Sequence, residues 1–457
     1  MIALPELIVV FLVGFLLVWL LRKIFSHGGN GGGDGGVIRG VEIESAGRLA
    51  SRQKDKGLGV QIAGVEIPPH LESQHILFAG ATGTGKSQGI SRILATVRAR
   101  RSRALIADAG GSFLSHSYAA GDLVLNPFDQ RTVDWSPFAE IREPYDCARI
   151  ARAAVPDGTG QAQEWNHYAQ VLLSEALQAH YVRGDRSVGS LMRTISAADR
   201  QDLLELLRDT PAAAFCGPDN EKMLSSIRSV ASSFLQSWRY LPDEGTFSIR
   251  NWIRAQGSNW VYLTYRDDQA ALLRPLVATL LELAITEGLS LSEDPSRDLW
   301  LIMDEVDSLG KVSTLRDGLS KLRKYGGKCV LGLQTISQLR STYGEHEAQT
   351  LMANISTKVI LRAGDGQTAE YFSTEIGDRE VEVVTVGKTR SLSQATSTTT
   401  NRDRRVERTV LASEISGLPD LHGFLKIPEH LIRIEIEPQQ YPENARAYIP
   451  RARSAQS

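Results

Sequence analysis

Short apolar runs alternate with stretches of helical periodicity along most of the chain. The runs that we expect to form strands are residues 60–67, which alternate like a hairpin, 75–79, 104–108, 123–125, 260–263, 299–303, 330–333 and 358–361. One of them, L-W-L-I-M at 299–303, is continuously apolar, as in a parallel strand that is buried on both faces. Strands that alternate with helices predict an α/β fold with a mostly parallel sheet covered on both faces.

The strand signals disappear from about Glu143 to Tyr240. Apolar residues recur there at helical spacing, in 165–182, 199–208 and 223–241. We therefore expect an all-α domain inserted into the α/β domain. A long helix follows at 267–289, capped by Asp267, and Pro275 must kink or restart it.

The N-terminal pattern is different, because an unbroken apolar run from Leu7 to Leu21 is followed by Arg22 and Lys23. With the apolar residues beside it, the run approaches the roughly 20 residues that cross a bilayer. The positive charges follow the run and no small-residue cleavage site is evident, so we expect a retained transmembrane anchor. The positive-inside rule then places the rest of the chain in the cytoplasm. A buried core helix is the alternative.

These patterns predict the domain organisation. Residues 26–36 (S-H-G-G-N-G-G-G-D-G-G) form a flexible linker, because Gly-rich chains behave as coils. Residues 389–408 are rich in Ser and Thr and then charged, which indicates an exposed loop or hairpin. The expected parts are an anchor (1–25), the linker (26–36), a first nucleotide-domain segment (37–142), the all-α domain (143–245), a second nucleotide-domain segment (246–445) and a tail (446–457).

Composition is globular and narrows the possible partners. Of 457 residues, 42% are hydrophobic and 23% charged, and the formal net charge is −2. There is no global basic field, so any contact with nucleic acid must be a local patch. The three cysteines, Cys147, Cys216 and Cys329, have no C-x-x-C spacing, which fits a reducing cytoplasm and buried apolar roles.

The chemistry begins with the octet G-A-T-G-T-G-K-S at 80–87, which matches the phosphate-binding P-loop. It lies between an expected strand and an expected helix, the context that this motif needs. Its glycines let backbone N–H groups surround a polyphosphate, Lys86 would reach the β- and γ-phosphates, and the Ser87 hydroxyl would hold Mg²⁺. The predicted ligands are ATP and Mg²⁺. The predicted nucleotide-binding residues are Gly80, Ala81, Thr82, Gly83, Thr84, Gly85, Lys86, Ser87 and Gln88.

A P-loop needs a second carboxylate to complete its magnesium site. Asp304 and Glu305 follow the 299–303 run, where a Walker B pair belongs. We expect Asp304 to hold the metal and Glu305 to orient and polarise the attacking water. A helix-start acidic pair is the alternative.

Two further residues are candidate catalytic groups. Gln334 ends the next expected strand and would sense the γ-phosphate; a surface or capping role is the alternative. Arg323 lies in the basic cluster K-L-R-K at 321–324 and would reach a neighbouring subunit's nucleotide as an arginine finger. A solvated basic face is the alternative.

Several segments carry a family resemblance. They are H-I-L-F-A-G-A-T-G-T-G-K-S (75–87), D-L-V-L-N-P-F-D-Q-R (122–131) with Trp135, F-S-I-R-N-W (247–252), L-W-L-I-M-D-E (299–305), L-R-K-Y-G-G-K (322–328) with G-L-Q (332–334), T-K-V-I-L-R (357–362) with T-A-E (368–370), and L-P-D-L-H-G-F-L (418–425). Over most of its length after the linker, the chain resembles the coupling proteins of type IV secretion and bacterial conjugation, of the TraD/TrwB kind.

The resemblance implies a RecA-like P-loop domain with an inserted all-α domain, anchored in the bacterial inner membrane and assembled as a hexamer around a channel. ATP hydrolysis, stimulated by DNA, would deliver DNA and its bound relaxase to the secretion channel. In similar proteins the residue matching Arg323 acts in trans, and the one matching Gln334 responds to nucleotide. Family members often have two transmembrane helices; the sequence indicates one, which puts the usual periplasmic contacts in doubt.

A ring motor grips phosphates, so DNA binding should depend on salt and tolerate sequence changes. Candidate contacts are Lys321, Lys324, Lys328, Arg340, Arg183, Arg186, Arg193, Arg228, Arg239, Trp238 and Tyr240. Two rival functions remain: a DNA pump of the FtsK/HerA type that acts in segregation, and a nucleotide-gated membrane receptor that docks substrates without pumping.

Overall fold

The computed structural model describes residues 37–52, 57, 59–390 and 396–451. The predicted anchor (1–25) and linker (26–36) lie outside these residues. The chain divides into two compact units, Met1–Glu42 with Ser373–Val410, and Ile43–Phe372 with Leu411–Ser457. Each unit is described by itself below.

The smaller unit is built on a β-ribbon. Its three strands have the order β1 (Val37–Gly40), β12 (Asp378–Arg390) and β13 (Thr396–Arg408) among the described residues. β12 and β13 pair antiparallel over their whole length, from Asp378 opposite Arg408 to Arg390 opposite Thr396. Of the two alternatives for 389–408, the hairpin is therefore right. Its first strand begins well before the expected segment, because V-E-V-V-T-V at 381–386 is rich in β-branched residues.

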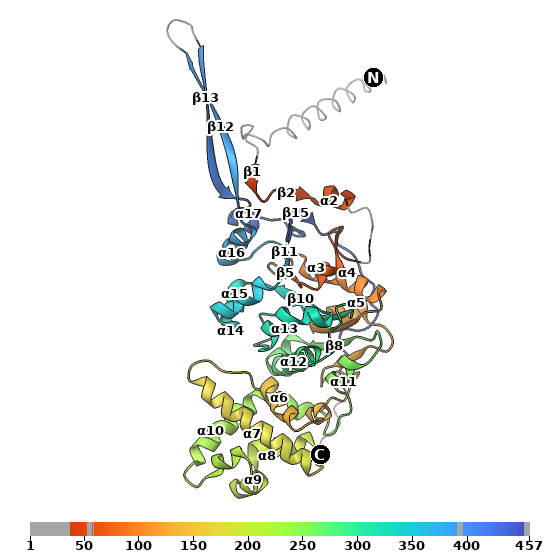
Figure 1. Ribbon diagram of the computed structural model, residues 1–457. Helices are drawn as coiled ribbons and strands as arrows, with labels where there is room; N and C mark the ends of the chain where they lie inside the picture. The colour runs from red at the N-terminus through yellow and green to blue at the C-terminus, as the bar shows by residue number, and fades with distance from the viewer. Residues whose placement is uncertain (1–36, 53–56, 58, 391–395, 452–457) are drawn as a thin grey trace, which may run out of the picture. The chain divides into compact units, whose positions relative to one another are not determined.

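The larger unit contains a ten-stranded mixed sheet among the described residues (Figure 1). In spatial order its strands are β2 (Ile43–Ser45), β15 (His430–Glu435), β14 (His422–Ile427), β11 (Thr357–Ile360), β5 (Ile76–Ala79), β10 (Gly327–Leu333), β9 (Leu299–Met303), β6 (Arg103–Ala109), β8 (Val261–Tyr265) and β7 (Leu123–Leu125). From β11 to β7 all neighbours are parallel, whereas β14 pairs antiparallel with β11 and β15. The predicted mostly parallel sheet is confirmed, with an antiparallel extension at one side.

The order of the central strands positions the site. β10 lies between β5 and β9, with Leu333 opposite Ala79 and Leu331 opposite Met303. Parallel strands bring their carboxyl ends to one edge of the sheet, so the residues that follow β5, β10 and β9 meet there.

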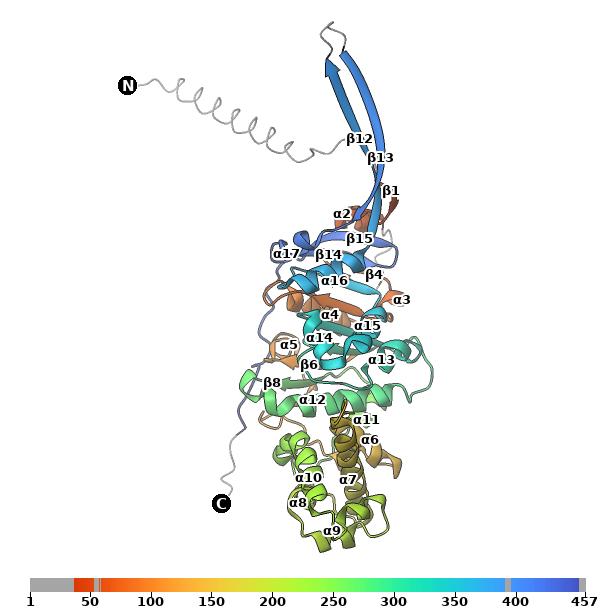
Figure 2. The same ribbon diagram turned by 90° about the vertical axis from the view of Figure 1, so that its left-hand side faces the viewer.

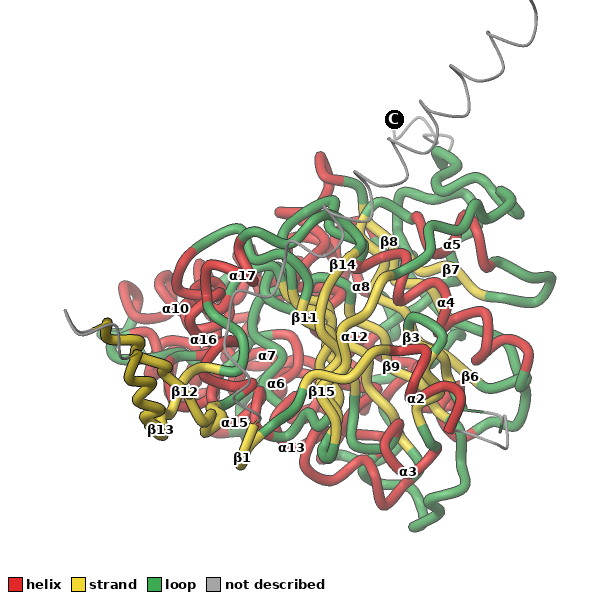
Figure 3. The backbone as a smooth tube through the Cα atoms, turned by 90° about the horizontal axis from the view of Figure 1, so that it is seen from above, coloured by secondary structure: helices red, strands yellow, loops and turns green. Residues whose placement is uncertain are grey.

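Helices cover both faces of this sheet, as the view from above shows (Figure 3). Outside residues 145–254, the described helices are, in chain order, α2 (Ala46–Arg52), α3 (Pro69–Glu72), α4 (Lys86–Ala99), α5 (Ser112–Ser117), α12 (Asp267–Gly288), α13 (Leu315–Lys321), α14 (Ile336–Tyr343), α15 (Glu345–Ala353), α16 (Gly366–Ile376) and α17 (Ala412–Ser416), with the 3-10 helices η1 (Pro137–Glu140) and η4 (Leu322–Tyr325). A separate antiparallel hairpin, β3 (Val60–Ile62) and β4 (Val65–Ile67), matches the predicted one.

The packing of α4 on β5 depends on a glycine. Phe78 of β5 is fully buried in the apolar core. A Cβ atom at Gly89 of α4 would lie 2.3 Å from the Phe78 ring, so the helix approaches the strand closely only because Gly89 has no side chain. This contact holds the start of α4 against the end of β5, where the P-loop connects them.

Described residues 145–240 contain helices and no strand. They form α6 (Tyr145–Ala154), α7 (Ala162–Val182), α8 (Val188–Ala197), α9 (Arg200–Leu206), η2 (Pro211–Cys216), α10 (Glu221–Phe234) and η3 (Gln236–Tyr240), followed by α11 (Ile249–Arg254) (Figure 2). This group packs on α12 through α6 and η3. We keep the name all-α domain for it; the predicted domain limits stay a prediction.

Helix α12 is one uninterrupted element through Pro275, so the expected restart does not occur. Its N-cap is Arg266, and Asp267 is its first residue and not its cap. Among the described residues α12 alone is long and apolar enough to cross a membrane, and 67% of its apolar window is buried within the protein. It is therefore a core helix of the larger unit.

Candidate nucleotide site

The octet at 80–87 forms the loop between β5 and α4. Gly80 N donates to Leu333 O at 3.0 Å, and Ala81 N donates to Arg362 O at 2.8 Å, so the loop is tied to the ends of the two strands beside β5. Gly83 and Gly85 have φ angles of 79° and 112°, which residues with a side chain rarely adopt. The loop thus has the backbone conformation for which these glycines were predicted.

The amino end of α4 is open toward the loop. Its N-cap is Gly85, which has no side chain to satisfy the first N–H groups of the helix. On the outer side, Leu421 N donates to Thr84 O at 2.9 Å and supports the loop from the C-terminal part of the chain. Free N–H groups at a helix start, together with the helix dipole, make a site for an anionic group such as a phosphate.

Lys86 lies inside the curve of the loop. Its Nζ donates to Gly80 O at 2.8 Å and to Ala81 O at 3.1 Å. Burial lowers the pKa of Lys86, and the carboxylates of Asp304, Glu305 and Asp307 oppose this shift. The ammonium group is thus buried within the loop, and a stronger anionic partner could replace the backbone carbonyls that it contacts.

The second half of the site comes from the end of β9. Asp304 Oδ2 lies 3.5 Å from Ser87 Oγ, at the outer limit of a hydrogen bond. Its Oδ1 is buried without a hydrogen-bond partner among the described residues. Burial raises the pKa of Asp304 to about 6, and Lys86 opposes this shift. An orphaned carboxylate oxygen beside a serine hydroxyl fits a divalent cation, which would supply the missing partner.

Glu305 and Gln334 are in direct contact. Gln334 Nε2 donates to Glu305 Oε1 at 2.7 Å, and Gln334 Oε1 lies 3.5 Å from Thr82 Oγ1. Glu305 Oε2 accepts from Ser308 Oγ at 3.2 Å. The amide of Gln334 therefore connects the P-loop with the carboxylate after β9, an arrangement in which a change at the phosphate would move Glu305.

Arg323 lies elsewhere. It is exposed in η4, which precedes β10, whereas Gln334 follows β10. At about 3.3 Å per residue, the strand separates Arg323 from the carboxyl-end site by about 20 Å. Within the described residues its guanidinium has no hydrogen bond or ion pair. Arg323 cannot reach the P-loop of its own chain, and a role in trans stays open to it.

Sequence reasoning missed two residues that shape the site. Asp108 follows Ala107, which pairs with Met303, so its carboxylate lies beside Asp304; its Oδ1 is buried and unpartnered among the described residues. Burial raises the pKa of Asp108 to about 7. The signal was visible, because L-I-A-D at 105–108 repeats the pattern of an acid after an apolar strand.

Gly332 is the second. A Cβ there would lie 1.7 Å from Asp304 O, so the turn after β9 crosses β10 in direct contact with its backbone. Sequence alone shows a glycine in a strand but does not show which backbone it meets.

The structure corrects two of the proposed DNA contacts. Lys328 is buried, with Nζ 2.8 Å from Glu72 Oε2 and 2.6 Å from Asp298 Oδ1, and Trp238 is 1% exposed. Neither is available to a polymer.

Cys147, Cys216 and Cys329 are buried free thiols, as expected of small apolar residues.

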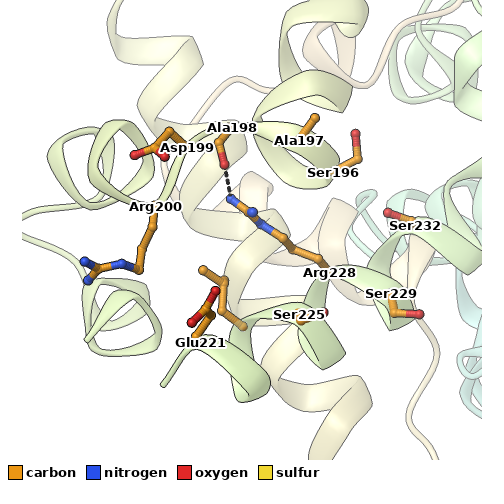
Figure 4. A pocket seen from close by; sticks show the side chains of 11 residues that line it. Ser196, Ala197, Ala198, Asp199, Arg200, Glu221, Ser225, Arg228, Ser229 and Ser232 are labelled. Atoms are coloured by element: carbon orange, nitrogen blue, oxygen red, sulfur yellow. Dashed lines mark hydrogen bonds between the residues drawn. The ribbon is translucent and has the colours of Figure 1, made fainter. Parts of the chain in front are cut away.

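Other candidates line a polar groove along α10. Two adjoining cavities of about 620 and 390 Å³ share Ser229 and Ser232. In the first, Arg228 extends across the groove and donates to Ala198 O at 2.6 Å (Figure 4). Arg239 and the half-exposed Tyr240 line the second.

A Gly-rich loop between a parallel strand and a helix, with a buried carboxylate beside it at the end of a neighbouring strand, defines the class of the protein as an α/β protein of the P-loop kind. The family described as "Type IV secretion-system coupling protein DNA-binding domain" matches residues 59–437. The chain belongs to this family of coupling proteins.

The comparisons agree in sequence and structure. Coupling protein TraD of Escherichia coli strain K12 is 28% identical over 463 residues, covering 98% of this chain and 64% of TraD. The bacterial conjugative coupling protein TrwBdeltaN70 has a TM-score of 0.85 and 36% identity, covering 92% of this chain and 98% of that one. TrwB in complex with ADP and Mg²⁺ has a TM-score of 0.84 at the same 36% identity. The chain spans slightly less than two thirds of the length of TraD.

Proposed function

We propose that this chain is the membrane-anchored, hexameric ATPase that couples DNA and its relaxase to a type IV secretion channel. The observation that carries the proposal is the contact chain from Thr82 through Gln334 to Glu305, beside Ser87 and Asp304. TrwB structures hold ADP with Mg²⁺ and the ATP analogue ADPNP, which supports ATP and Mg²⁺ as the ligands of this site.

Each residue then has a role in hydrolysis. Lys86 leaves the carbonyls of Gly80 and Ala81 for the β- and γ-phosphates, and Ser87 and Asp304 hold the cation. The bound Mg²⁺ supplies positive charge that offsets the charge developing on the phosphates. Glu305 accepts a hydrogen bond from the attacking water and orients it. When the γ-phosphate is lost, Gln334 transmits the change at Thr82 to Glu305 through its two side-chain contacts.

Arg323 completes the site between subunits. Its distance from its own P-loop requires a neighbouring chain if it is to act on a nucleotide. An arginine finger in trans is worth about 10³-fold or more in phosphoryl transfer, which makes hydrolysis depend on the ring.

The DNA partner follows from the family description, which names a DNA-binding domain. Exposed basic residues remain for phosphate contact, among them Lys321, Lys324, Arg239 and the groove along α10. Contacts of this kind release counterions, so affinity should fall steeply with salt and vary little with sequence. The membrane anchor is carried by the apolar N-terminal sequence alone.

A transfer assay tests the proposal. A strain that lacks the coupling gene is complemented with the wild-type gene or with Lys86→Ala. We expect the wild type to restore conjugative transfer and Lys86→Ala to restore none. Full transfer with Lys86→Ala would refute an ATP-driven role, and transfer with neither would favour a segregation pump of the FtsK/HerA type.

A receptor that docks substrates without pumping is the remaining alternative. Glu305 and Arg323 argue against it, since a switch needs no groups for rapid turnover. Steady-state hydrolysis with and without DNA separates the two, because a receptor would show no stimulation by DNA.

A further inference from the structure

His75 is a buried histidine that joins three elements at the amino ends of the strands. It directly precedes β5, has a left-handed backbone (φ 66°) and is 1% exposed. Its Nε2 lies 2.9 Å from Leu319 O, and Cys329 N donates to its Nδ1 at 3.0 Å. Leu319 belongs to α13 and Cys329 to β10, so one ring connects the P-loop strand with the helix before Arg323 and with the strand before Gln334.

The contacts define which ring nitrogen carries the proton. A backbone N–H can only donate, so Nδ1 accepts from Cys329 and the proton is on Nε2. Nε2 then donates to the Leu319 carbonyl. Burial lowers the pKa of His75 to about 4, so the ring is neutral at pH 7 and makes both bonds together.

The Leu319 carbonyl occupies an informative place in its helix. In a continuous α-helix, the carbonyl of residue 319 faces the N–H of residue 323. The last carbonyls of a helix lack regular partners. α13 ends at Lys321 and η4 begins at Leu322, so the imidazole donates to a carbonyl just before the helix changes its geometry. This bond fixes the end of α13 relative to β5.

The turn after Arg323 is held from its other side by backbone bonds. Lys324 O accepts from Asp294 N at 3.0 Å, and Gly326 O accepts from Leu299 N at 3.2 Å. These bonds lead to the start of β9. The imidazole supplies the matching contact toward β5, so the turn is fixed from both neighbouring strands although the Arg323 side chain itself is exposed.

We propose that His75 is a positioning residue for Arg323: its imidazole holds the end of α13 so that Arg323 projects toward the nucleotide of the neighbouring subunit. This rests on the proposed function, because it needs Arg323 to act between subunits. Within the described residues the guanidinium has no polar partner, so the backbone alone directs it. Misplacing such a group by 1 Å costs on the order of 10²-fold in rate.

The test replaces His75 by Asn in the full-length chain and measures hydrolysis with ATP, Mg²⁺ and DNA. Asn tolerates a positive φ, and its short amide matches Nδ1, so the bond from Cys329 is kept and the bond to Leu319 is lost. We expect kcat to fall at least about tenfold while KM for ATP stays within about twofold. If His75→Asn keeps the wild-type kcat while Arg323→Ala is slow, the role of His75 is refuted and the arginine finger is not. If Arg323→Ala also keeps the wild-type kcat, both the arginine finger and the role of His75 are refuted.

Mixed rings provide a readout that simple damage would not give. His75→Asn subunits retain their P-loop, and Lys86→Ala subunits retain their finger. Co-assembly should therefore raise hydrolysis above that of either variant alone. If mixing with Lys86→Ala subunits restores hydrolysis to Arg323→Ala but not to His75→Asn, then His75→Asn damages the nucleotide site of its own subunit. This result would overturn the proposal. The double variant His75→Asn/Arg323→Ala should be no slower than Arg323→Ala, and an additive loss would contradict the coupling.

A second buried histidine serves as the control. His180 of the all-α domain lies 2.9 Å from Asp185 Oδ2 through Nδ1 and 2.9 Å from Thr194 Oγ1 through Nε2. His180→Asn should keep kcat, and a loss equal to that of His75→Asn would point to general destabilisation. If His75→Asn does not fold, His75→Gln carries the test. Its longer amide reaches Leu319, so near-normal turnover is expected, and turnover as low as that of Arg323→Ala overturns the proposal.

Discussion

Glu305→Gln separates nucleotide binding from hydrolysis with little change in shape. Glu305 Oε1 accepts from Gln334 Nε2 at 2.7 Å, and Oε2 accepts from Ser308 Oγ at 3.2 Å. A carboxamide keeps the first bond through its oxygen. The second survives because the Ser308 hydroxyl can rotate and accept from the new NH₂ group. The substitution therefore removes the charge and basicity of the group and leaves its packing in place.

The size of the effect follows from the role assigned to Glu305. A positioned general base contributes about 10²- to 10⁴-fold, so we expect the barrier to rise by about 3 to 5 kcal/mol. Binding of Mg²⁺–ADPNP should be unchanged, because the P-loop, Lys86 and Ser87 are untouched.

The assay compares steady-state hydrolysis with titration of Mg²⁺–ADPNP by calorimetry. Glu293→Gln is the matched control, since Glu293 is an exposed glutamate shortly before β9. The expected result is a loss of turnover in Glu305→Gln alone, with equal affinities in all three proteins. Turnover of Glu305→Gln within about threefold of the wild type would remove Glu305 from catalysis, since a base is worth at least about 10²-fold.

Three further predictions concern other parts of the site. Gly332→Ala places a Cβ 1.7 Å from Asp304 O and should lower the stability by about 3 kcal/mol and remove most of the affinity for Mg²⁺–nucleotide. Gly366→Ala is the control, because a Cβ at Gly366 meets nothing within 4 Å. Equal melting temperatures of the two variants would contradict the close packing at Gly332. The pKa of His75 is about 4 in the folded chain and 6.5 in the unfolded chain, so between these values the unfolded chain binds a proton that the folded chain does not. The neutral ring therefore contributes about 3 kcal/mol of stability above pH 6.5, and this contribution is lost as the pH falls toward 4. The gap in melting temperature between wild type and His75→Asn should therefore narrow from pH 7 to pH 5, and a constant gap would refute the neutral buried ring. Arg323→Ala subunits mixed with Lys86→Ala subunits should regain hydrolysis, and no gain at any ratio would count against a finger in trans.

Hydrophobic periodicity and sequence motifs predicted the central strands and the candidate functional residues that follow them. The apolar runs at 123–125 and 299–303 coincide with β7 and β9, because strands buried on both faces leave an uninterrupted apolar signal. The P-loop and Asp304 follow from local sequence in the same way, since each directly succeeds a strand of a parallel sheet. The sequence indicated Gln334 and Glu305 as separate candidates, and the structure adds the 2.7 Å hydrogen bond between their side chains.

Contacts between distant segments escaped the sequence. Lys328 was a candidate DNA contact close to the basic cluster at 321–324, yet it is buried against Glu72, which lies far away along the chain. The ribbon strand β12 was missed, although valines alternate with charged residues in E-V-E-V at 380–383, the pattern of a half-buried strand. His75 was assigned to the strand, whereas its left-handed backbone places it before β5, where tertiary contacts to Leu319 and Cys329 hold it.

The most direct test of the account is ATP hydrolysis by the purified full-length protein with Mg²⁺, measured with and without DNA and beside Lys86→Ala. The account predicts hydrolysis that DNA stimulates several-fold at low salt, that declines as salt displaces the DNA, and that is absent in Lys86→Ala. Hydrolysis retained by Lys86→Ala, or none by the wild type under any of these conditions, would contradict it.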